Sequence, residues 1–210
     1  MTMPLHAPDD EIVHVVDDDD AFRDSLVWLI EAKAHHVVAH ASAEAFLDAC
    51  RPGMVGCLVV DVRMPGLSGI QLHARLGELG IELPTIVVTG HGDVPMAVDA
   101  FRKGVVDFVE KPLDGAYLLS RIDLCLALDR ERRRLRRRSA ALAARLATLS
   151  AREREVMEHV VAGRLNKQIA DALDISIKTV EVHRSRVMEK MQAASVADLV
   201  RVSLELAGRG

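Results

Sequence analysis

The stretch Leu58-Val59-Val60-Asp61-Val62-Arg63-Met64-Pro65 decides the fold of the first half of this chain. Its branched apolar residues predict a strand that is buried on both faces, as the strands of parallel sheets are. Asp61 is the single carboxylate in the run, and Pro65 followed by Gly66 predicts where the strand stops. Because chemistry in open α/β sheets gathers at the carboxyl ends of the strands, Asp61 stands where a nucleophile or a metal ligand is expected.

Similar apolar runs predict further strands, each followed by a helix. The predicted strands lie at 11–16, from 37 onward, up to 61, at 84–89 and at 105–109. Helical spacing of apolar residues, or a capping serine such as Ser42, predicts helices around 22–30, after 42, at 68–79, at 94–103 and after Pro112. This alternation predicts a parallel sheet of five strands, doubly wound by helices on both faces, in the flavodoxin-like class.

Polar side chains end four of the predicted strands. Asp17 and Asp18 follow the first strand, Asp61 ends the third, Thr89 ends the fourth and Lys111 follows the fifth. The carboxyl ends of parallel strands meet at one rim of the sheet, so these groups are expected to converge there. Carboxylates that close repel each other unless a hard cation lies among them, and Mg²⁺ prefers such oxygen ligands. A lysine at the same rim gives a phosphoryl group a positive partner.

Each of these signals has a more common explanation when it is taken alone. Acidic residues before a helix usually cap it, and Asp19 and Asp20 are expected to do so. A threonine suits any strand, and Lys-Pro often forms a turn. Their joint occurrence at successive strand ends is what indicates a site.

The first half resembles a response-regulator receiver domain over roughly residues 11–128. The motifs that carry the resemblance are Val15-Val16-Asp17-Asp18, the run from Val59 to Pro65, Val87-Val88-Thr89-Gly90 and Phe108-Val109-Glu110-Lys111-Pro112. The stretch Thr89-Gly90-His91-Gly92-Asp93-Val94-Pro95-Met96 is particularly similar to the FixJ subfamily.

The resemblance implies a role for each of these residues. Asp61 would receive a phosphoryl group from a sensor histidine kinase. Asp17 and Asp18, with Asp61 and the backbone carbonyl of Arg63, would hold Mg²⁺. Lys111 would pair with the phosphate, and the peptide bond before Pro112 would be cis. Thr89 and Phe108 would form a switch pair, in which the hydroxyl moves inward and the ring follows.

A long helix is predicted to join the two halves. Residues 114–149 contain no Gly or Pro after Gly115, and Ala, Leu and Arg dominate. Leu128, Leu135, Leu142 and Leu149 repeat every seven residues, but Glu131, Arg138 and Arg145 occupy positions between them. A solvated helical linker is therefore favoured over a coiled coil, which stays open as an alternative. The predicted organisation is a tail at 1–10, a receiver at 11–128, a linker at 129–147 and a DNA-binding domain at 148–210.

Capping residues predict four short helices in the second half. Ser150 with Glu153 forms a capping box for a helix that ends at Ala162. Further predicted helices are 167–173 capped by Asn166, 177–191 capped by Ser176, and a last helix to 206 capped by Ser195. The second and third have the proportions of a helix-turn-helix.

The predicted helix 177–191 has two different faces. One stripe, which is expected to pack inward, consists of Val180, His183, Val187 and Met191. The opposite face carries side chains that suit the major groove of DNA, although an ordinary solvated face would also carry charge. These side chains belong to Lys178, Glu181, Val182 and Ser185, flanked by Arg184 and Arg186.

The second half resembles the LuxR/NarL-type DNA-binding domain over about residues 148–207. The matching motifs are 149–156, 166–170 and 176–184. The resemblance implies that 177–191 is the recognition helix and that a positioning helix begins at Asn166-Lys167, whose amides and lysine meet phosphate. The last helix would be a dimer face on DNA. The implied DNA-contacting residues are Asn166, Lys167, Lys178, Thr179, Glu181, Val182, Arg184, Ser185 and Arg186.

Composition agrees with two halves that meet different partners. Residues 1–128 hold 9 Lys/Arg and 20 Asp/Glu, a net charge of −11, whereas residues 129–210 hold 18 and 11, a net charge of +7. An acidic half suits a cation and a basic half suits a polyanion. The apolar run 26–30 is too short to cross a membrane, and residues 1–10 do not resemble a signal peptide, so a cytoplasmic protein is expected. The three cysteines, without CxxC spacing, are expected to be small apolar thiols.

The combined expectation is a transcription regulator of a two-component system rather than an enzyme. Its implied partners are a sensor histidine kinase, double-stranded DNA, a second copy of the chain when phosphorylated, and RNA polymerase, with Mg²⁺ as cofactor and no membrane. Two alternatives stay open. One is a Mg²⁺-dependent phosphohydrolase with Asp61 as nucleophile, although Arg63 stands where an acid is usually needed. The other is an interaction protein that never receives phosphate.

Overall fold

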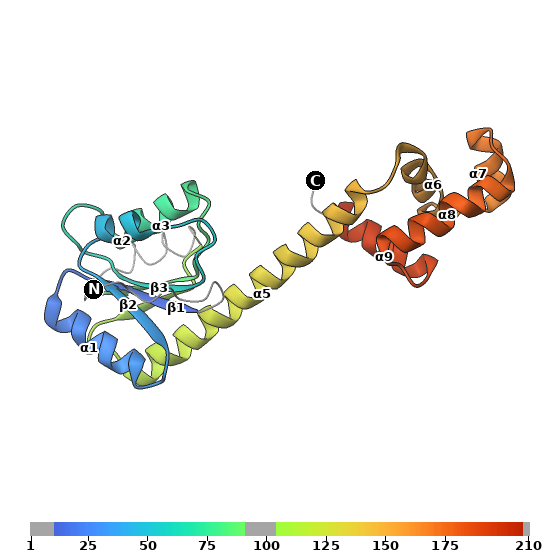
Figure 1. Cartoon of the computed structure of the whole chain (residues 1–210). Helices are drawn as coiled ribbons and strands as arrows, with labels where there is room; N and C mark the ends of the chain where they lie inside the picture. Colours follow the sequence, from blue (N-terminus) through green and yellow to red (C-terminus); the bar gives the residue numbers. More distant parts are fainter. Residues whose placement is uncertain (1–10, 91–103, 208–210) are drawn as a thin grey trace, which may run out of the picture. The chain divides into compact units, whose positions relative to one another are not determined.

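The computed structural model describes residues 11–90 and 104–207 (Figure 1). The chain divides into two compact units, one up to Arg132 and one from Arg133 onward. The division falls within the segment 129–147 that the sequence assigns to a linker. Each unit has its own hydrophobic core, and each is described by itself below.

The first unit is built on a parallel sheet of five strands. The strands are β1 (Ile12–Val16), β2 (His36–His40), β3 (Gly56–Asp61), β4 (Thr85–Thr89) and β5 (Asp107–Glu110), in the order β2-β1-β3-β4-β5. Val16 pairs with Val60, and Thr89 pairs with Glu110, so the carboxyl ends of the central strands lie level. This order is the predicted flavodoxin-like topology, which is therefore confirmed.

The fifth strand is shifted from its predicted position at 105–109. It begins at Asp107, because the chain still turns at Gly104, where φ is +90°. Val106 donates a single hydrogen bond to the carbonyl of Thr85 before the ladder starts. The strand therefore ends one residue later than predicted, directly before Lys111.

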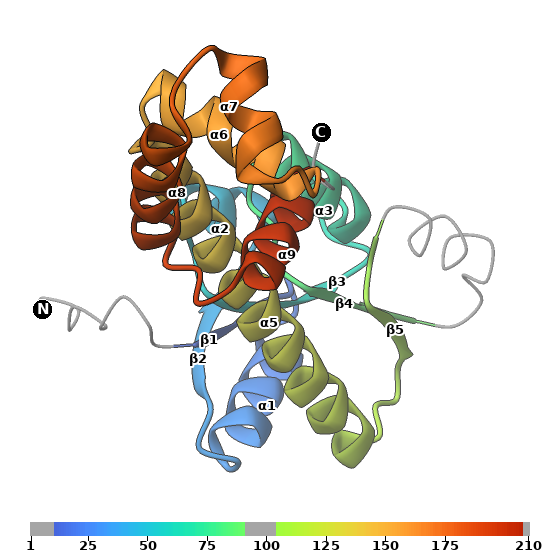
Figure 2. The ribbon, with the colours of Figure 1, turned by 90° about the vertical axis from the view of Figure 1, so that its right-hand side faces the viewer.

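Helices cover both faces of this sheet (Figures 1 and 2). α2 (Ala43–Ala49) and α3 (Gly69–Glu78) pack their apolar side chains on one face, and α1 (Asp20–Glu31) and the start of α5 (Gly115–Ala147) pack theirs on the other. The predicted caps Asp19 and Ser42 accept hydrogen bonds from the first turn of their helices, whereas Asp20, also expected to cap, is the first residue of α1. Ser68, which was not predicted as a cap, caps α3 in the same way. The predicted helix at 94–103 lies outside the described residues.

The amino end of β3 is held close to its neighbours. Gly56 has φ of +127°, and a Cβ there would lie 1.8 Å from the carbonyl oxygen of Ile12, so only glycine fits. Its N–H donates to Asp129 Oδ2 of α5 at 3.2 Å, and Arg130 of α5 pairs with Glu11 at 2.6 Å.

Burial raises the pKa of Cys125, which lies in the core between α1 and α5, to about 12, so this thiol stays protonated at neutral pH.

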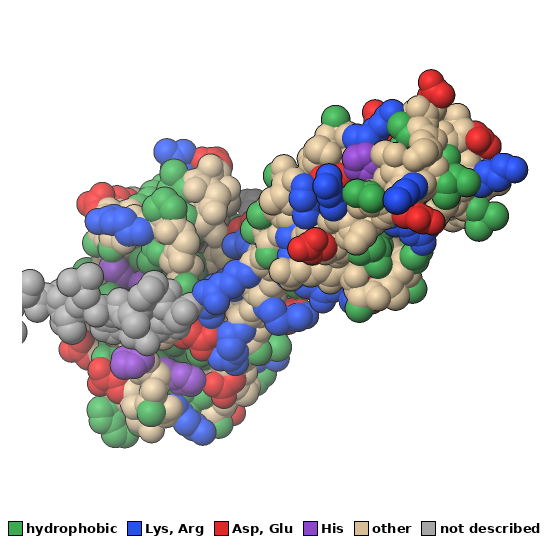
Figure 3. Space-filling view, turned by 45° about the vertical axis from the view of Figure 1, so that its right-hand side comes forward, with side chains coloured by type: hydrophobic (Ala, Val, Ile, Leu, Met, Phe, Trp, Pro, Cys, Tyr) green, Lys and Arg blue, Asp and Glu red, His purple; other side chains and the backbone are tan. Residues whose placement is uncertain are grey.

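α5 is one continuous helix of 33 residues, as predicted, and it begins after the cap Asp114. Arginine occupies seven of the nine positions from Arg130 to Arg138, and Lys and Arg side chains gather along α5 in the space-filling view (Figure 3). Within the described residues, the structure contains no helix that is both long enough and apolar enough to cross a bilayer.

The second unit consists of the end of α5 followed by α6 (Ala151–Val161), α7 (Asn166–Leu173), α8 (Ile177–Met191) and α9 (Val196–Ala207). Its core is formed by the inner faces of these helices. Leu142 and Leu149, which belong to the heptad series, are buried in this core, and Leu146 packs against it. Packing within the unit therefore accounts for the second half of the heptad pattern.

The caps of the second unit agree with the sequence at three helices and differ at one. Ser150 forms the predicted capping box with Glu153, and Ser176 and Ser195 accept from the first turns of α8 and α9. The prediction that Asn166 caps α7 is wrong. Leu165 occupies the cap position, and the side chain of Gln168 accepts from its N–H at 2.9 Å. Asn166 is instead the first helical residue.

Candidate functional site

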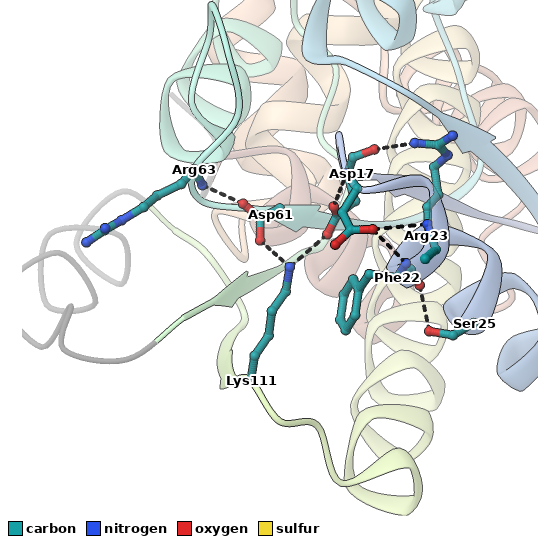
Figure 4. A network of polar contacts seen from close by, with 9 residues as sticks. Asp17, Phe22, Arg23, Ser25, Asp61, Arg63 and Lys111 are labelled. Carbon is teal, nitrogen blue, oxygen red and sulfur yellow. Dashed lines mark hydrogen bonds and ion pairs between the residues drawn. The ribbon is translucent and has the colours of Figure 1, made fainter.

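The carboxyl ends of β1, β3 and β5 bring Asp17, Asp61 and Lys111 together (Figure 4). Lys111 Nζ lies 2.7 Å from Asp61 Oδ1 and 3.0 Å from Asp17 Oδ2. These residues are up to 94 positions apart in the chain, and only the parallel sheet places them side by side. The predicted convergence at one rim therefore holds for two carboxylates and the ammonium group.

Backbone N–H groups fix the two carboxylates from behind. Asp61 Oδ2 accepts from the N–H of Arg63 at 2.6 Å, and Asp17 Oδ1 accepts from the N–H of Asp19 at 2.9 Å. The side chains of Asp17 and Asp61 are only 2% and 8% exposed. Their remaining oxygens face Lys111, so the rim is preorganised around a positive charge.

Electrostatics at this rim favour cations. Burial raises the pKa of Asp17 above its usual value, and the hydrogen bonds from Asp19 and Lys111 offset this only in part. Burial also opposes the charge of Lys111, but its hydrogen bonds to Asp61 and Asp17 outweigh burial and raise its pKa. Since a buried carboxylate is costly to ionise without a cation, a second cation beside Asp17 would stabilise this site.

The structure does not bring Asp18 into the cluster. Asp18 is exposed, and within the described ranges 11–90 and 104–207 no three His, Cys, Asp or Glu side chains meet as a metal site. The side chain of Arg63 points away from Asp61, and its predicted role involves only the backbone carbonyl (Figure 4). The buried oxygens of Asp17 and Asp61 nevertheless suit Mg²⁺, which binds through one or two carboxylates and keeps several waters.

Of the predicted switch residues, Thr89 is the last residue of β4, and Phe108 lies within β5. The Thr89 hydroxyl is buried and donates to the carbonyl of Gly90 at 3.0 Å, while the Thr89 carbonyl accepts from the Lys111 N–H at 2.7 Å. Phe108 is half-buried against the core under α2 and α3. The bond between Lys111 and Pro112 is cis, as the resemblance implies. The segment 91–103, which follows Thr89 and Gly90, lies outside the described residues.

Two residues at the rim were not identified from the sequence. Arg23 Nη1 donates to the Asp17 carbonyl at 2.7 Å and pairs with Asp20, which ties α1 to the end of β1. Phe22 faces Lys111, whose Nζ lies 3.8 Å from the ring centroid. The apolar period of α1 marks Phe22 only as a core position. Its place in the first turn after the aspartate run is the one signal that could have indicated the rim.

In the second unit, α8 has the two predicted faces. Val180, Val187 and Met191 are buried, and His183 is half-buried with its Nδ1 enclosed and without a hydrogen-bond partner among the described residues. The outer face is exposed at Lys178, Glu181, Val182, Ser185 and Arg186. Thr179 and Arg184 are half-buried at its edges. A surface with this mixture of charged and apolar groups can contact both phosphates and base edges.

α7 and α8 are joined by a side-chain contact at the start of α7. Arg184 Nη1 donates to Asn166 Oδ1 at 2.8 Å, so both side chains hold the helices together. Lys167 is exposed in the first turn of α7, and the cap residue Leu165 offers this turn no side-chain hydrogen bond. Such a helix start can contact a phosphate.

The capping box of α6 is tied to α8 by an ion pair. Lys190 Nζ lies 2.6 Å from Glu153 Oε2, and Glu153 also accepts from the Ser150 N–H at 2.8 Å. The hydrogen bond from Lys190, then that from Ser150, lowers the pKa of Glu153 to about 2.

We expect this ion pair to make the second unit sensitive to acid. A carboxyl group whose pKa is lowered on folding stabilises the folded state above its unfolded pKa, and that contribution fades as pH falls towards the folded pKa. The unfolding temperature of Glu153→Gln should therefore lie a few degrees below that of the wild type at pH 7, and the gap should close between pH 4.5 and about 2. Thermal unfolding followed by circular dichroism across this pH range measures the gap. A gap that stays constant would contradict the assignment.

Comparisons with known proteins agree with both units. Residues 13–123 match the response regulator receiver domain, and residues 147–203 match the bacterial regulatory proteins of the luxR family. The transcriptional regulatory protein FixJ of Azorhizobium caulinodans is 49% identical over 201 residues, which cover 96% of this chain and 95% of that protein.

Solved structures show the same similarity. The response regulator StyR is 38% identical, with a TM-score of 0.87 over 93% of this chain and 99% of that chain. Full-length FixJ from B. japonicum is 43% identical, with a TM-score of 0.59 over 96% of this chain and 100% of that chain. The matches extend over the sheet with its acidic rim and over the helices around α8. This chain therefore belongs to the two-component response regulators that join a receiver domain to a LuxR-type DNA-binding domain, within the FixJ subfamily.

Proposed function

We propose that Asp61 is phosphorylated by a sensor histidine kinase in the cytoplasm and that this switches dimerisation and sequence-specific DNA binding. The observation that carries the proposal is the position of Lys111 Nζ, 2.7 Å from Asp61 and 3.0 Å from Asp17. A nucleophilic carboxylate, a second acid and a fixed ammonium group are what transfer of a phosphoryl group to a side chain requires. The proposed domain limits are 11–128, 129–147 and 148–210, with Leu142 of the linker completing the second core.

The chemical step would transfer a phosphoryl group from a phosphohistidine. A carboxylate oxygen of Asp61 attacks the phosphorus, the P–O bond forms, and the P–N bond breaks with its electron pair leaving on the histidine nitrogen. Lys111 holds positive charge beside the incoming phosphoryl oxygens. The N–H of Arg63 keeps the second Asp61 oxygen in place, so one oxygen of the carboxylate is aimed at the phosphorus.

Magnesium fits the same rim. Asp17, Asp18, Asp61 and the Arg63 carbonyl are the proposed protein ligands, and the buried carboxylates Asp17 and Asp61 support this assignment. Bound Mg²⁺ would neutralise charge on the transferred phosphoryl group. Asp18 is free to contribute from its exposed position at the start of the loop before α1.

The proposed switch is a population shift towards an active state. The phosphoryl group adds roughly −1.5 to −2 charges beside Thr89, whose hydroxyl would turn from Gly90 towards the new oxygens. The Phe108 ring would follow the Thr89 hydroxyl inward. Two copies of the chain would then dimerise through the face near β5. Two copies of α8 could then read two half-sites, with α9 as a dimer face and RNA polymerase as the final partner. The proposed contacts with DNA are made by the nine residues of α7 and α8 named above. Two of them, Asn166 and Arg184, are hydrogen-bonded to each other.

Labelling the purified protein tests the proposal. We expect stoichiometric phosphorylation of Asp61 by acetyl phosphate with Mg²⁺ and none with EDTA, measured by mass spectrometry of the intact protein and of its peptides. Beryllofluoride with Mg²⁺ should increase both the dimer fraction and DNA binding, because this complex imitates the phosphoryl group. Absence of label and of any beryllofluoride response would leave an interaction protein as the better explanation.

A phosphohydrolase is the less favoured function. Its site usually needs an acid near the nucleophile to protonate the leaving group, and the residue two positions after Asp61 is Arg63, whose side chain points away (Figure 4). Slow self-dephosphorylation is expected, without turnover of a phosphate-ester substrate. The similarity to transcription regulators over most of the chain supports the same conclusion.

A further inference from the structure

We propose that Phe22 is a positioning residue for Lys111, and that its ring sets how tightly the rim holds a phosphoryl group. The inference rests on the proposed phosphorylation of Asp61. It starts from one distance: Lys111 Nζ lies 3.8 Å from the centroid of the Phe22 ring while it also contacts the two carboxylates (Figure 4). An ammonium group over the face of an aromatic ring is attracted by the ring quadrupole.

The backbone of Phe22 is held by hydrogen bonds in the first turn of α1. The Phe22 N–H donates to Asp19 Oδ1 at 3.1 Å, and the Phe22 carbonyl accepts from Ser25 Oγ at 2.7 Å. The ring also packs against the core between α1 and α5. Lys111, by contrast, carries its charge on a flexible stem of four carbons. A fixed ring face therefore limits where the ammonium group can go.

This contact has a special property during phosphorylation. Lys111 has three N–H donors, and those that now face the carboxylate oxygens of Asp17 and Asp61 would turn towards the oxygens of the incoming phosphoryl group. The face of the ring attracts the positive charge, but it is not a conventional hydrogen-bond acceptor and so occupies none of these N–H donors. Phe22 thus keeps the ammonium group at the rim while its hydrogen-bond partners change, so that binding of a phosphoryl group does not have to order this side chain first.

Three variants separate this role from simple packing. Phe22→Leu keeps apolar bulk but removes the ring face, Phe22→Tyr keeps the ring, and Val37→Ala removes packing from the same core without touching Lys111. We expect Phe22→Leu to bind beryllofluoride with Mg²⁺ between about two- and thirtyfold more weakly than the wild type. Phe22→Tyr and Val37→Ala should bind within about twofold of the wild type, as isothermal titration calorimetry can measure.

A second readout needs neither metal nor phosphate. A ring face over the ammonium group shifts the NMR signals of the adjacent Lys111 methylene protons upfield, and this shift should vanish in Phe22→Leu and persist in Phe22→Tyr. An unchanged methylene signal in Phe22→Leu overturns the inference, as does equal weakening in Val37→Ala. If the wild type itself fails to bind beryllofluoride, the proposed function fails, while the NMR experiment still decides whether the ring holds Lys111.

Discussion

Asp61→Asn should carry no phosphoryl label after incubation with acetyl phosphate and Mg²⁺. An amide is a far poorer nucleophile than a carboxylate, and the variant also loses one of the two negative charges that face Lys111 at 2.7 and 3.0 Å. Removal of a nucleophile commonly lowers reactivity by about a thousandfold or more, so labelling should fall to background. The label is measured as the mass increase of the intact protein.

The matched control for this variant is Asp48→Asn. Asp48 is exposed at the end of α2, so the control makes the same chemical change away from the rim and should label like the wild type. The DNA-binding response to acetyl phosphate should also be absent from Asp61→Asn and present in Asp48→Asn. Normal labelling of Asp61→Asn would place the acceptor elsewhere and end the proposed mechanism.

Lys178→Glu should weaken DNA binding by about tenfold to a hundredfold. Lys178 is exposed in the first turn of α8, on the face opposite the buried residues Val180 and Val187. The substitution replaces an attraction to DNA by a repulsion, and it leaves the core of the unit intact. The slope of log binding constant against log salt should also become less steep by about one, because one phosphate contact is lost.

Lys33→Glu is the control, since it makes the same change in net charge on an exposed residue of the first unit. Fluorescence anisotropy with a duplex selected from a random pool by the wild-type protein, in beryllofluoride and Mg²⁺, measures both variants at several salt concentrations. Equal losses in the two variants would indicate that only net charge matters, and no loss in Lys178→Glu would remove α8 from the interface.

Much of the site could be predicted from the sequence, because strand ends are marked by residue type. The apolar run before Asp61 and the position of Asp17 directly after β1 indicate that these two residues reach the rim, once the sheet is known to be parallel. The same signal also predicts Asp18, which is exposed outside the cluster. Capping side chains fixed most helix starts for the same reason. The predicted cap of α7 is wrong because Asn166 is a residue type that suits a cap. Only the fold shows that its side chain accepts a hydrogen bond from Arg184 instead.

The sequence could not predict contacts between side chains that neither helical nor strand periodicity relates to each other. His14 and His40 look like ordinary strand residues, yet their rings lie buried against each other with the nitrogens 3.4 Å apart, and both pack on Phe46. Burial, then the charge of His40, lowers the pKa of His14 to about 4, so it is neutral in the folded protein at pH 7. Phe22 is a similar case, because its spacing predicts burial and says nothing of Lys111.

The long helix α5 has a consequence for how such proteins can diversify. It supplies Leu126 to the core of the first unit and Leu142 to the core of the second, and among the described residues between them none belongs to either core. Substitutions in this middle segment therefore leave both hydrophobic cores intact, as long as the contacts of Asp129 with Gly56, of Arg130 with Glu11 and of Arg138 with Glu205 are kept. A receiver domain and a DNA-binding domain can therefore be recombined between related proteins at a junction within this single helix.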